Sequence, residues 1–199
     1  MVHILVCPGI HNLQLTRDFL SSIEQFISLP RCPQQPLLVF PTQDSPAYSA
    51  KHILQFLRDF EAREGTVSQL AIIAFSAGVV GAIGAAWGWR WQGRTIAAFV
   101  ALDGWGVPLY GDFPIYRLSH DYFTHGSSSL LGNGTRSFYA DPEVSHLDLW
   151  RMPHRVWGWQ VGDRLPRSRL TAAEFMSEIL HRHGAMSDDL EPRSVESDK

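Results

Sequence analysis

The chain has 199 residues, of which 45% are hydrophobic and 19% are charged, proportions typical of a soluble globular protein with one well-formed core. Its formal net charge is −3 and it contains no basic run, which argues against nucleic acid or an anionic membrane as the main partner. Two cysteines, Cys7 and Cys32, are too few for a disulfide framework or a cysteine-based metal site.

The N-terminal sequence, MVHILVC, has no basic segment and too short an apolar run for a signal peptide. A cytoplasmic location is therefore expected. The seven tryptophans all fall between residues 87 and 159. We expect them to be packing residues, with some lining an apolar groove.

The first part of the chain alternates short apolar runs with segments of helical spacing. Residues 3–7 (HILVC) and 37–40 (LLVF) are predicted to be buried strands, and apolar residues over 15–27 recur at helical spacing between them. Ser45 and Pro46 then have the sequence of a helix start, with serine as the N-cap and proline at the first helical position.

Residues 70–91 read LAIIAFSAGVVGAIGAAWGWRW and are the segment around which the rest is organised. The run up to Phe75 predicts a buried parallel strand, and the glycine- and alanine-rich remainder predicts a closely packed helix. Ser76 stands between them, with the small residues Ala74 and Gly78 two positions away on either side. This is the layout of a nucleophile elbow, in which a serine sits on a sharp strand-to-helix turn. The alternative is that Ser76 only caps the helix.

Residues 70–89 also carry no charge over the length of a transmembrane helix. Their glycine and alanine content makes them only moderately hydrophobic. The alternating strands and helices around them also need this segment in their sheet. We therefore expect no membrane span.

A fourth strand is predicted at Thr95–Leu102, ending at Asp103. Four strands alternating with helices predict an α/β fold with a parallel sheet and right-handed crossovers. Ligands of such sheets bind at the carboxyl ends of the strands, and this rule brings residues 9–12, residues 42–44, Ser76 and Asp103 to one edge.

The remaining chain is less regular. Residues 104–135 are rich in turn signals and have the length of a small lid over this edge. Residues 136–140 predict another strand, whereas 156–161 fit either a last strand or an irregular apolar segment. The sequence TAAE at 171–174 is a capping box that starts a final helix. We expect one domain over 1–184 and a disordered tail over 185–199.

A serine, a strand-end aspartate and a later histidine follow one another here in the chain order of α/β hydrolases. The loop at 8–11 (PGIH), the elbow at 74–78 (AFSAG) and the phrase at 146–153 (HLDLWRMP) carry this likeness. The chain resembles a compact member of the α/β-hydrolase superfamily and is similar to small hydrolase-like proteins of cyanobacteria, over most of 1–184. The elbow has Ala74 where the usual pattern has glycine, a tolerated variant. The resemblance implies a three-layer α/β/α fold with a mostly parallel sheet and a minimal cap.

The resemblance also implies roles for individual residues. Ser76 would be the nucleophile, activated by a histidine that follows the last core strand, and His146 fits that place best. Asp103 is the first choice for the acid that holds the histidine, and Asp141 is the second. The oxyanion hole would be formed by the backbone N–H groups of Ile10 and Ala77.

A second cluster of polar residues, SHDYFTH at 119–125, competes with these assignments. His120 or His125 are the alternative bases, and His120, Asp121 and His125 are the residues of an alternative metal-dependent hydrolase. Their spacing matches no defined zinc pattern, and a hydrogen-bonded loop that anchors the lid is the simpler interpretation.

The sequence thus favours a serine hydrolase that cleaves a carboxylic ester or thioester through an acyl-enzyme, with an apolar small-molecule substrate and no cofactor or metal. The other function that stays open is a non-catalytic binding protein with the same fold. That alternative predicts that the serine, histidine and acid side chains do not meet at hydrogen-bonding distance.

Overall fold

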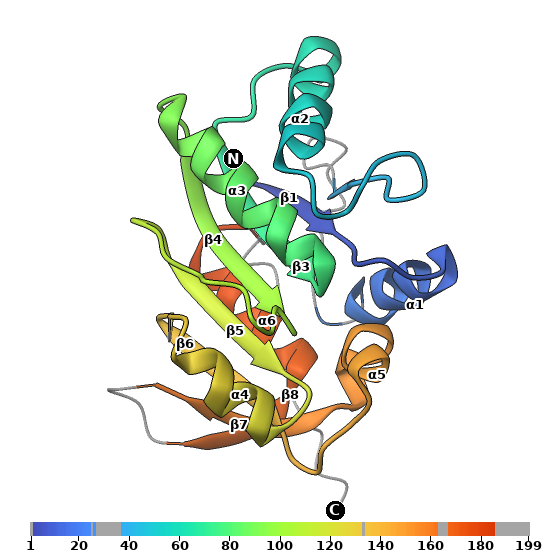
Figure 1. Ribbon diagram of the computed structural model, residues 1–199, viewed down its shortest axis with the longest axis vertical. Helices are drawn as coiled ribbons and strands as arrows, with labels where there is room; N and C mark the ends of the chain where they lie inside the picture. Colours follow the sequence, from blue (N-terminus) through green and yellow to red (C-terminus); the bar gives the residue numbers. More distant parts are fainter. Residues whose placement is uncertain (1, 25, 27–36, 133, 163–166, 186–199) are drawn as a thin grey trace, which may run out of the picture.

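The computed structural model describes residues 2–24, 26, 37–132, 134–162 and 167–185 (Figure 1). Its centre is an eight-stranded sheet with the spatial order β2-β1-β3-β4-β5-β6-β7-β8. Neighbouring strands are parallel from β2 through β6, and β7 and β8 are antiparallel additions at one end. The strands are β1 (Val2–Cys7), β2 (Leu37–Val39), β3 (Gln69–Phe75), β4 (Thr95–Leu102), β5 (Ile115–Ser119), β6 (Arg136–Ala140), β7 (Trp157–Val161) and β8 (Ser168–Thr171).

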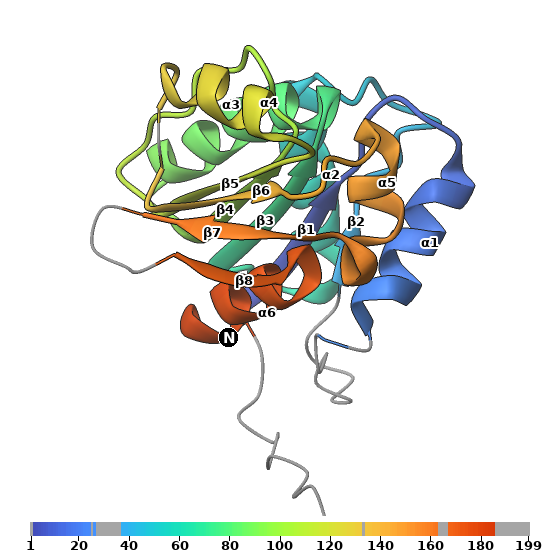
Figure 2. The same cartoon turned by 90° about the horizontal axis from the view of Figure 1, so that it is seen from below.

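Helices cover both faces of this sheet, which gives the three layers seen edge-on in Figure 2. The helices are α1 (Leu13–Glu24), α2 (Ala50–Glu64), α3 (Ala77–Trp91), α4 (Tyr122–Ser129), α5 (His146–Arg151), the short 3-10 helix η1 (Pro153–Arg155) and α6 (Ala172–Arg182). One core packs α1, α5 and α6 against the sheet, and a second core packs α2 and α3 against the opposite face.

The two cores follow from the alternation of side chains along each buried strand. In β1, Ile4 and Val6 belong to the first core, whereas Leu5 and Cys7 belong to the second. Because both faces are covered, these strands are almost continuously apolar, as expected for parallel strands in an α/β fold. The predicted α/β class with a mostly parallel sheet is therefore confirmed.

The strands predicted at 3–7, 37–40, 70–75, 95–102 and 136–140 are all present, with ends that differ by at most one residue. The capping box is also confirmed: the Thr171 side chain accepts from the Glu174 N–H, and the Glu174 side chain accepts from the Thr171 N–H. The segment at 156–161, left open between two interpretations, forms β7 from Trp157 onward.

The predicted helix start at Ser45 and Pro46 is wrong. Successive turns occupy this stretch, in which the N–H groups of Asp44 and Ser45 bond to Pro41 O. Helix α2 begins only at Ala50, where the Ser49 side chain caps the His52 N–H. A serine–proline pair is compatible with a turn as well as with a helix start, and here the turns carry the chain around the end of β2.

The expectation of an irregular segment over 104–135 is also wrong, because this stretch contains β5 and α4. The sequence of β5, IYRLS, does not look like a buried strand because it contains the polar residues Arg117 and Ser119, yet these are only 4% and 3% exposed. Arg117 is tolerated there because its guanidinium donates to the carbonyls of Val107, Leu131 and Gly132.

Two further expectations concern the ends of segments. Helix α1 ends at Glu24, and residues 25 and 27 of the predicted 15–27 helix lie outside the described residues. The predicted tail at 185–199 also lies outside them, apart from Ala185, which is buried. Residues 70–89 are divided between β3 and α3, and no helix in the described part of the chain is long and apolar enough to cross a bilayer.

Candidate active site

The candidate site lies where the parallel strands β3, β4 and β5 end at the same edge of the sheet (Figure 1). The residue that follows β3 is Ser76, and the residue that follows β4 is Asp103. His120 follows β5, and His146 is the first residue of α5, a short turn after β6. The parallel pairing therefore gathers four polar side chains from four separate parts of the sequence.

Ser76 turns the chain sharply from β3 into α3. Its backbone has φ of 52° and ψ of −123°, a conformation that costs a non-glycine residue about 1–3 kcal/mol. The Ser76 side chain makes no capping hydrogen bond to α3. Helix capping, the alternative interpretation of Ser76, therefore does not account for a serine at this position.

Small residues around Ser76 allow the backbone segments to approach closely. A Cβ atom added at Gly78 would lie 2.4 Å from both Cys7 O and Pro8 O, inside van der Waals contact. A Cβ atom added at Gly9 would lie 3.0 Å from the Ser76 Cβ. The loop after β1 thus packs directly against the turn that carries Ser76.

The two residues predicted for the oxyanion hole come from these same segments. Ala77 is the first residue of α3 and lines the pocket next to Ser76. Ile10 follows Gly9 in the loop after β1, and its side chain is 73% exposed.

Asp103 is the buried anion of the site, with a carboxyl group that is only 1% exposed. Its Oδ1 accepts from the His120 backbone N–H at 2.9 Å. Its Oδ2 accepts from the Nδ1 atoms of His120, at 2.9 Å, and of His146, at 2.8 Å. Burial on its own would raise the pKa of Asp103, but the hydrogen bonds from the two histidines outweigh it and hold the pKa below its ordinary value.

His146 is held by stacking as well as by Asp103. Its ring lies 4.6 Å from that of Phe75, the last residue of β3, and Trp150 stacks on the same Phe75 at 4.9 Å. When Nδ1 of His146 donates to Asp103, Nε2 is the nitrogen that is free to accept a proton.

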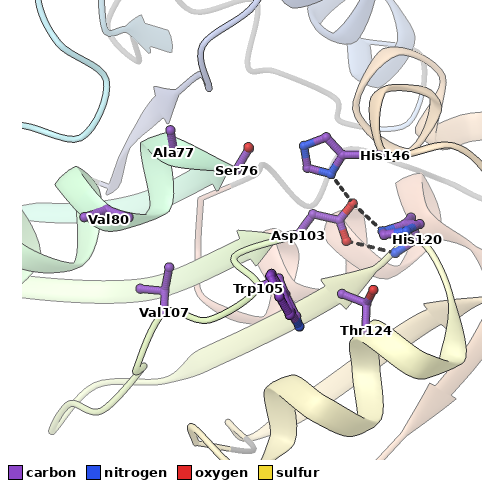
Figure 3. A pocket seen from close by; sticks show the side chains of 9 residues that line it. All are labelled: Ser76, Ala77, Val80, Asp103, Trp105, Val107, His120, Thr124 and His146. Atoms are coloured by element: carbon purple, nitrogen blue, oxygen red, sulfur yellow. Dashed lines mark hydrogen bonds and ion pairs between the residues drawn. The ribbon is translucent and has the colours of Figure 1, made fainter.

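Figure 3 shows the Ser76 hydroxyl and the His146 ring on the same side of the pocket. Among the residues drawn there, the dashed lines join Asp103 to the two histidines and none reaches Ser76. The histidine and the acid thus meet at hydrogen-bonding distance, whereas the serine is beside them without a bond. Catalytic hydrogen bonds are often long in ligand-free enzymes and shorten with substrate.

The sequence offers His120 as an alternative base, and the structure places it on the same carboxylate as His146. Its Nε2 lies 3.5 Å from Asp121 Oδ2. The hydrogen bond to Asp103 raises the pKa of His120, against the effect of partial burial. The strand-end rule would have placed His120 at this edge of the sheet, had β5 been recognised.

The other candidate residues do not join this cluster. The Asp121 carboxylate accepts from the Thr124 N–H as the N-cap of α4, and His125 packs its ring 5.2 Å from that of Tyr139. Asp141, the second choice for the acid, accepts from the Trp159 Nε1–H at 2.7 Å.

The metal-ligand set proposed from sequence, His120 with Asp121 and His125, is therefore not the one that the fold assembles. In the part of the chain that the structure describes, the His, Cys, Asp and Glu side chains close enough to hold a metal ion are Asp103, His120 and His146, with ligand atoms within 4.8 Å of one another.

The four side chains open into a pocket of about 410 Å³. Val80 of α3 and Val107 form apolar parts of its wall, and Thr124 of α4 contributes a polar one. Trp105, which is 64% exposed, also lines it and donates from Nε1 to Ser127 Oγ of α4 at 3.1 Å. Part of the predicted lid segment therefore does border the site.

Neither models of known protein families nor the curated proteins searched give a match to this chain.

Proposed function

We propose that the protein is a serine hydrolase of the α/β-hydrolase type that cleaves a carboxylic ester or thioester through an acyl-enzyme. One observation carries the proposal. A strained serine without a capping role opens into the same pocket as a histidine that is hydrogen-bonded to a buried aspartate. Serine, aspartate and histidine also follow one another in the chain order of that superfamily.

In the proposed reaction, His146 Nε2 takes the proton of Ser76 Oγ while this oxygen attacks the substrate carbonyl carbon. The Asp103 carboxylate keeps His146 in the required tautomer and stabilises the imidazolium that forms. The backbone N–H groups of Ala77 and Ile10 donate to the developing oxyanion, each contributing about 3–4 kcal/mol of transition-state stabilisation.

The tetrahedral intermediate then collapses, and His146 gives its proton to the leaving alcohol or thiol. A water molecule, deprotonated by His146, then attacks the carbonyl carbon of the acyl-Ser76 ester. As the bond to Ser76 Oγ breaks and the carboxylic acid leaves, His146 returns the proton to Ser76 Oγ. The side chains of Val80, Trp105 and Val107 in the pocket wall favour an apolar acyl or alcohol group in the substrate.

The test is labelling of the purified protein with a fluorophosphonate, which phosphonylates activated serines. We expect the wild type to be labelled and Ser76→Ala and His146→Ala to lose the label, while a control, Ser21→Ala at an exposed position of α1, keeps it. Labelling that survives in Ser76→Ala would overturn the assignment. Loss in Ser76→Ala alone would transfer the role of base to His120.

The missing hydrogen bond between Ser76 and His146 favours a second candidate, a binding protein of this fold without catalysis. This candidate predicts that a well-folded wild type is not labelled at any fluorophosphonate concentration.

A further inference from the structure

Asp103, His120 and His146 form a cluster with one more histidine, His120, than a Ser–His–Asp triad requires. They come from the ends of β4 and β5 and from the start of α5, and their ligand atoms lie within 4.8 Å of one another. We infer that Asp103 Oδ2, His120 Nδ1 and His146 Nδ1 bind one divalent transition-metal ion of the zinc class, and that this ion reversibly inhibits the enzyme. The inhibition rests on the proposed function, whereas the binding does not.

The distances are close to those of a metal site. The two Nδ1 atoms lie 2.9 Å and 2.8 Å from Asp103 Oδ2. Ligand atoms around a tetrahedral zinc ion, with bonds of about 2.0–2.1 Å, are separated by about 3.3–3.4 Å. To admit the ion, each imidazole must move about half an ångström away from the carboxylate, and the two rings, whose ligand atoms lie within 4.8 Å of each other, must close to about the same spacing.

The donor set selects the metal. Two imidazoles and one carboxylate suit zinc and its neighbours copper, nickel and cobalt, whereas magnesium and calcium prefer oxygen ligands alone. Three protein ligands leave a fourth position open, and all three of these residues line the pocket.

The surrounding contacts already orient the three ligands. The His120 backbone N–H donates to Asp103 Oδ1, so Oδ2 is the oxygen of this carboxylate that faces both rings and would bind the ion. On the far side of His120, Nε2 lies 3.5 Å from Asp121 Oδ2, so a small shift would give the histidine–carboxylate hydrogen bond that is typical of zinc ligands. His146 is stacked on Phe75.

An ion can reach this cluster from the pocket. The His120 and His146 side chains are 26% and 42% exposed, whereas the Asp103 carboxylate behind them is 1% exposed. The metal would thus enter between the two rings and meet the buried anion last.

Inhibition follows from the tautomer of His146. A metal ion at Nδ1 displaces the proton that this atom donates to Asp103, and a neutral ring then carries its proton on Nε2. Nε2 is the atom that must accept the Ser76 proton in the proposed reaction. With the ion bound, the ring has no free nitrogen to act as a base.

The test is a calorimetric titration of the untagged protein with zinc chloride. A second titration with cobalt chloride measures the visible absorption of bound Co²⁺, which depends on its coordination geometry. We expect one ion per chain for the wild type. Affinity should fall by about tenfold or more in His120→Gln and, as a second ligand variant, in His146→Gln. The control His125→Gln, whose ring packs on Tyr139, should bind like the wild type. Circular dichroism of each variant confirms that it is folded.

Fluorophosphonate labelling of the wild type should decrease over the same zinc concentrations and return with a chelator. No binding, or equal binding by the folded ligand variants and the wild type, would overturn the site. Binding without labelling under any condition would leave the metal site standing and overturn the proposed hydrolase instead. Labelling that is unchanged or enhanced by bound zinc would overturn the inhibition.

Discussion

Individual backbone conformations at the site are held by the neighbouring strands. Ser76 and Asp103, with φ of 52° and 50°, are the non-glycine residues with positive φ in the described chain. The Ser76 N–H bonds to Leu102 O, the last residue of β4, and the Asp103 N–H bonds to Leu118 O of β5. Each strained residue is thus fixed by the strand beside its own. This is how local strain persists at a functional site.

The first prediction concerns the carboxylate of Asp103. In the wild type, the carboxylate accepts from the His120 backbone N–H and from the Nδ1–H groups of His120 and His146. In Asp103→Asn one of the two oxygens becomes an NH₂ group, which cannot accept any of these bonds. His146 then loses the partner that fixes its tautomer. We expect kcat for an activated ester such as p-nitrophenyl butyrate to fall by about 10³- to 10⁴-fold.

The matched control is Asp141→Asn, at a carboxylate that accepts from Trp159 away from the histidines. It should keep its activity within a factor of about three, since its effect is below about 1 kcal/mol. The reverse result, with Asp141→Asn inactive and Asp103→Asn active, would make Asp141 the acid.

The second prediction concerns the close approach at Gly78. An alanine there places Cβ 2.4 Å from two backbone oxygens, which side-chain rotation cannot relieve. We expect Gly78→Ala to lower the free energy of unfolding by about 1–3 kcal/mol, measured by urea denaturation. Gly126→Ala in α4 is the control, because its Cβ meets no atom within 4 Å. That variant should be stabilised by up to about 1 kcal/mol through helix propensity. Equal effects at both positions would contradict the clash.

Whole elements depend on buried polar side chains in the second half of the sheet. Arg117 of β5 donates to the carbonyl of Val107, which precedes α4 in the chain, and to those of Leu131 and Gly132, which follow it. The segments before and after α4 are thereby bound to the strand. Burial lowers the pKa of Arg117 to about 10, which still leaves it charged at neutral pH. The charge is therefore kept inside the molecule by backbone oxygens.

The third prediction follows from this clamp. Arg117→Met keeps the apolar length of the side chain but leaves three partly buried carbonyls without their donor. We expect a loss of about 2–4 kcal/mol in the free energy of unfolding by urea. The control Arg169→Met changes an exposed arginine of β8 and should cost less than about 1 kcal/mol. A loss below that value in Arg117→Met would show that water replaces the guanidinium.

The same arginine explains why the elements of the chain could be predicted unequally. β3 and β4 can be predicted from the sequence because each has six or more consecutive small or apolar residues. β5 has five residues, and its Arg117 is buried only because the loops on either side of α4 supply its hydrogen-bond partners. Such partners are tertiary contacts, which no local pattern contains.

At the scale of the whole molecule, the alternation of strands and helices was enough to predict an α/β class and the edge of the sheet at which Ser76 and Asp103 both lie. The attachment of His120 to Asp103 was not predictable in the same way. It depends on β5 lying beside β4, with Leu102 paired to Leu118, so that the residues after both strands come together. Strand neighbours are set by packing of the entire sheet, and the sequence of 104–135 did not reveal a strand.

The last prediction concerns the pH dependence of global stability and involves His125. Its pKa is lowered by burial first and by the charges of Arg117 and Arg167 second, and the rings of Tyr122 and Tyr139 pack against it. The folded protein therefore keeps His125 neutral at pH values where the unfolded chain, with an ordinary pKa of about 6.5, binds a proton. As pH falls below about 6.5 the unfolded state is favoured, until the pH passes the lower folded pKa.

The contribution of His125 to the free energy of unfolding should accordingly decrease between pH 7.5 and pH 5. His125→Phe, which keeps a ring against Tyr139 but has no proton to bind, should therefore lose less stability over this range than the wild type does. Urea denaturation at several pH values measures both slopes. His125→Gln, which also removes the titrating ring, should change the slope in the same direction as His125→Phe. His120 acts in the opposite sense, because its pKa is raised and its contribution is present below about pH 6.5 and lost as pH rises. The effect of His125 is therefore measured as the difference in slope between His125→Phe and the wild type. Parallel slopes would contradict the prediction, because His125 would then be protonated as easily in the folded protein as in the unfolded chain.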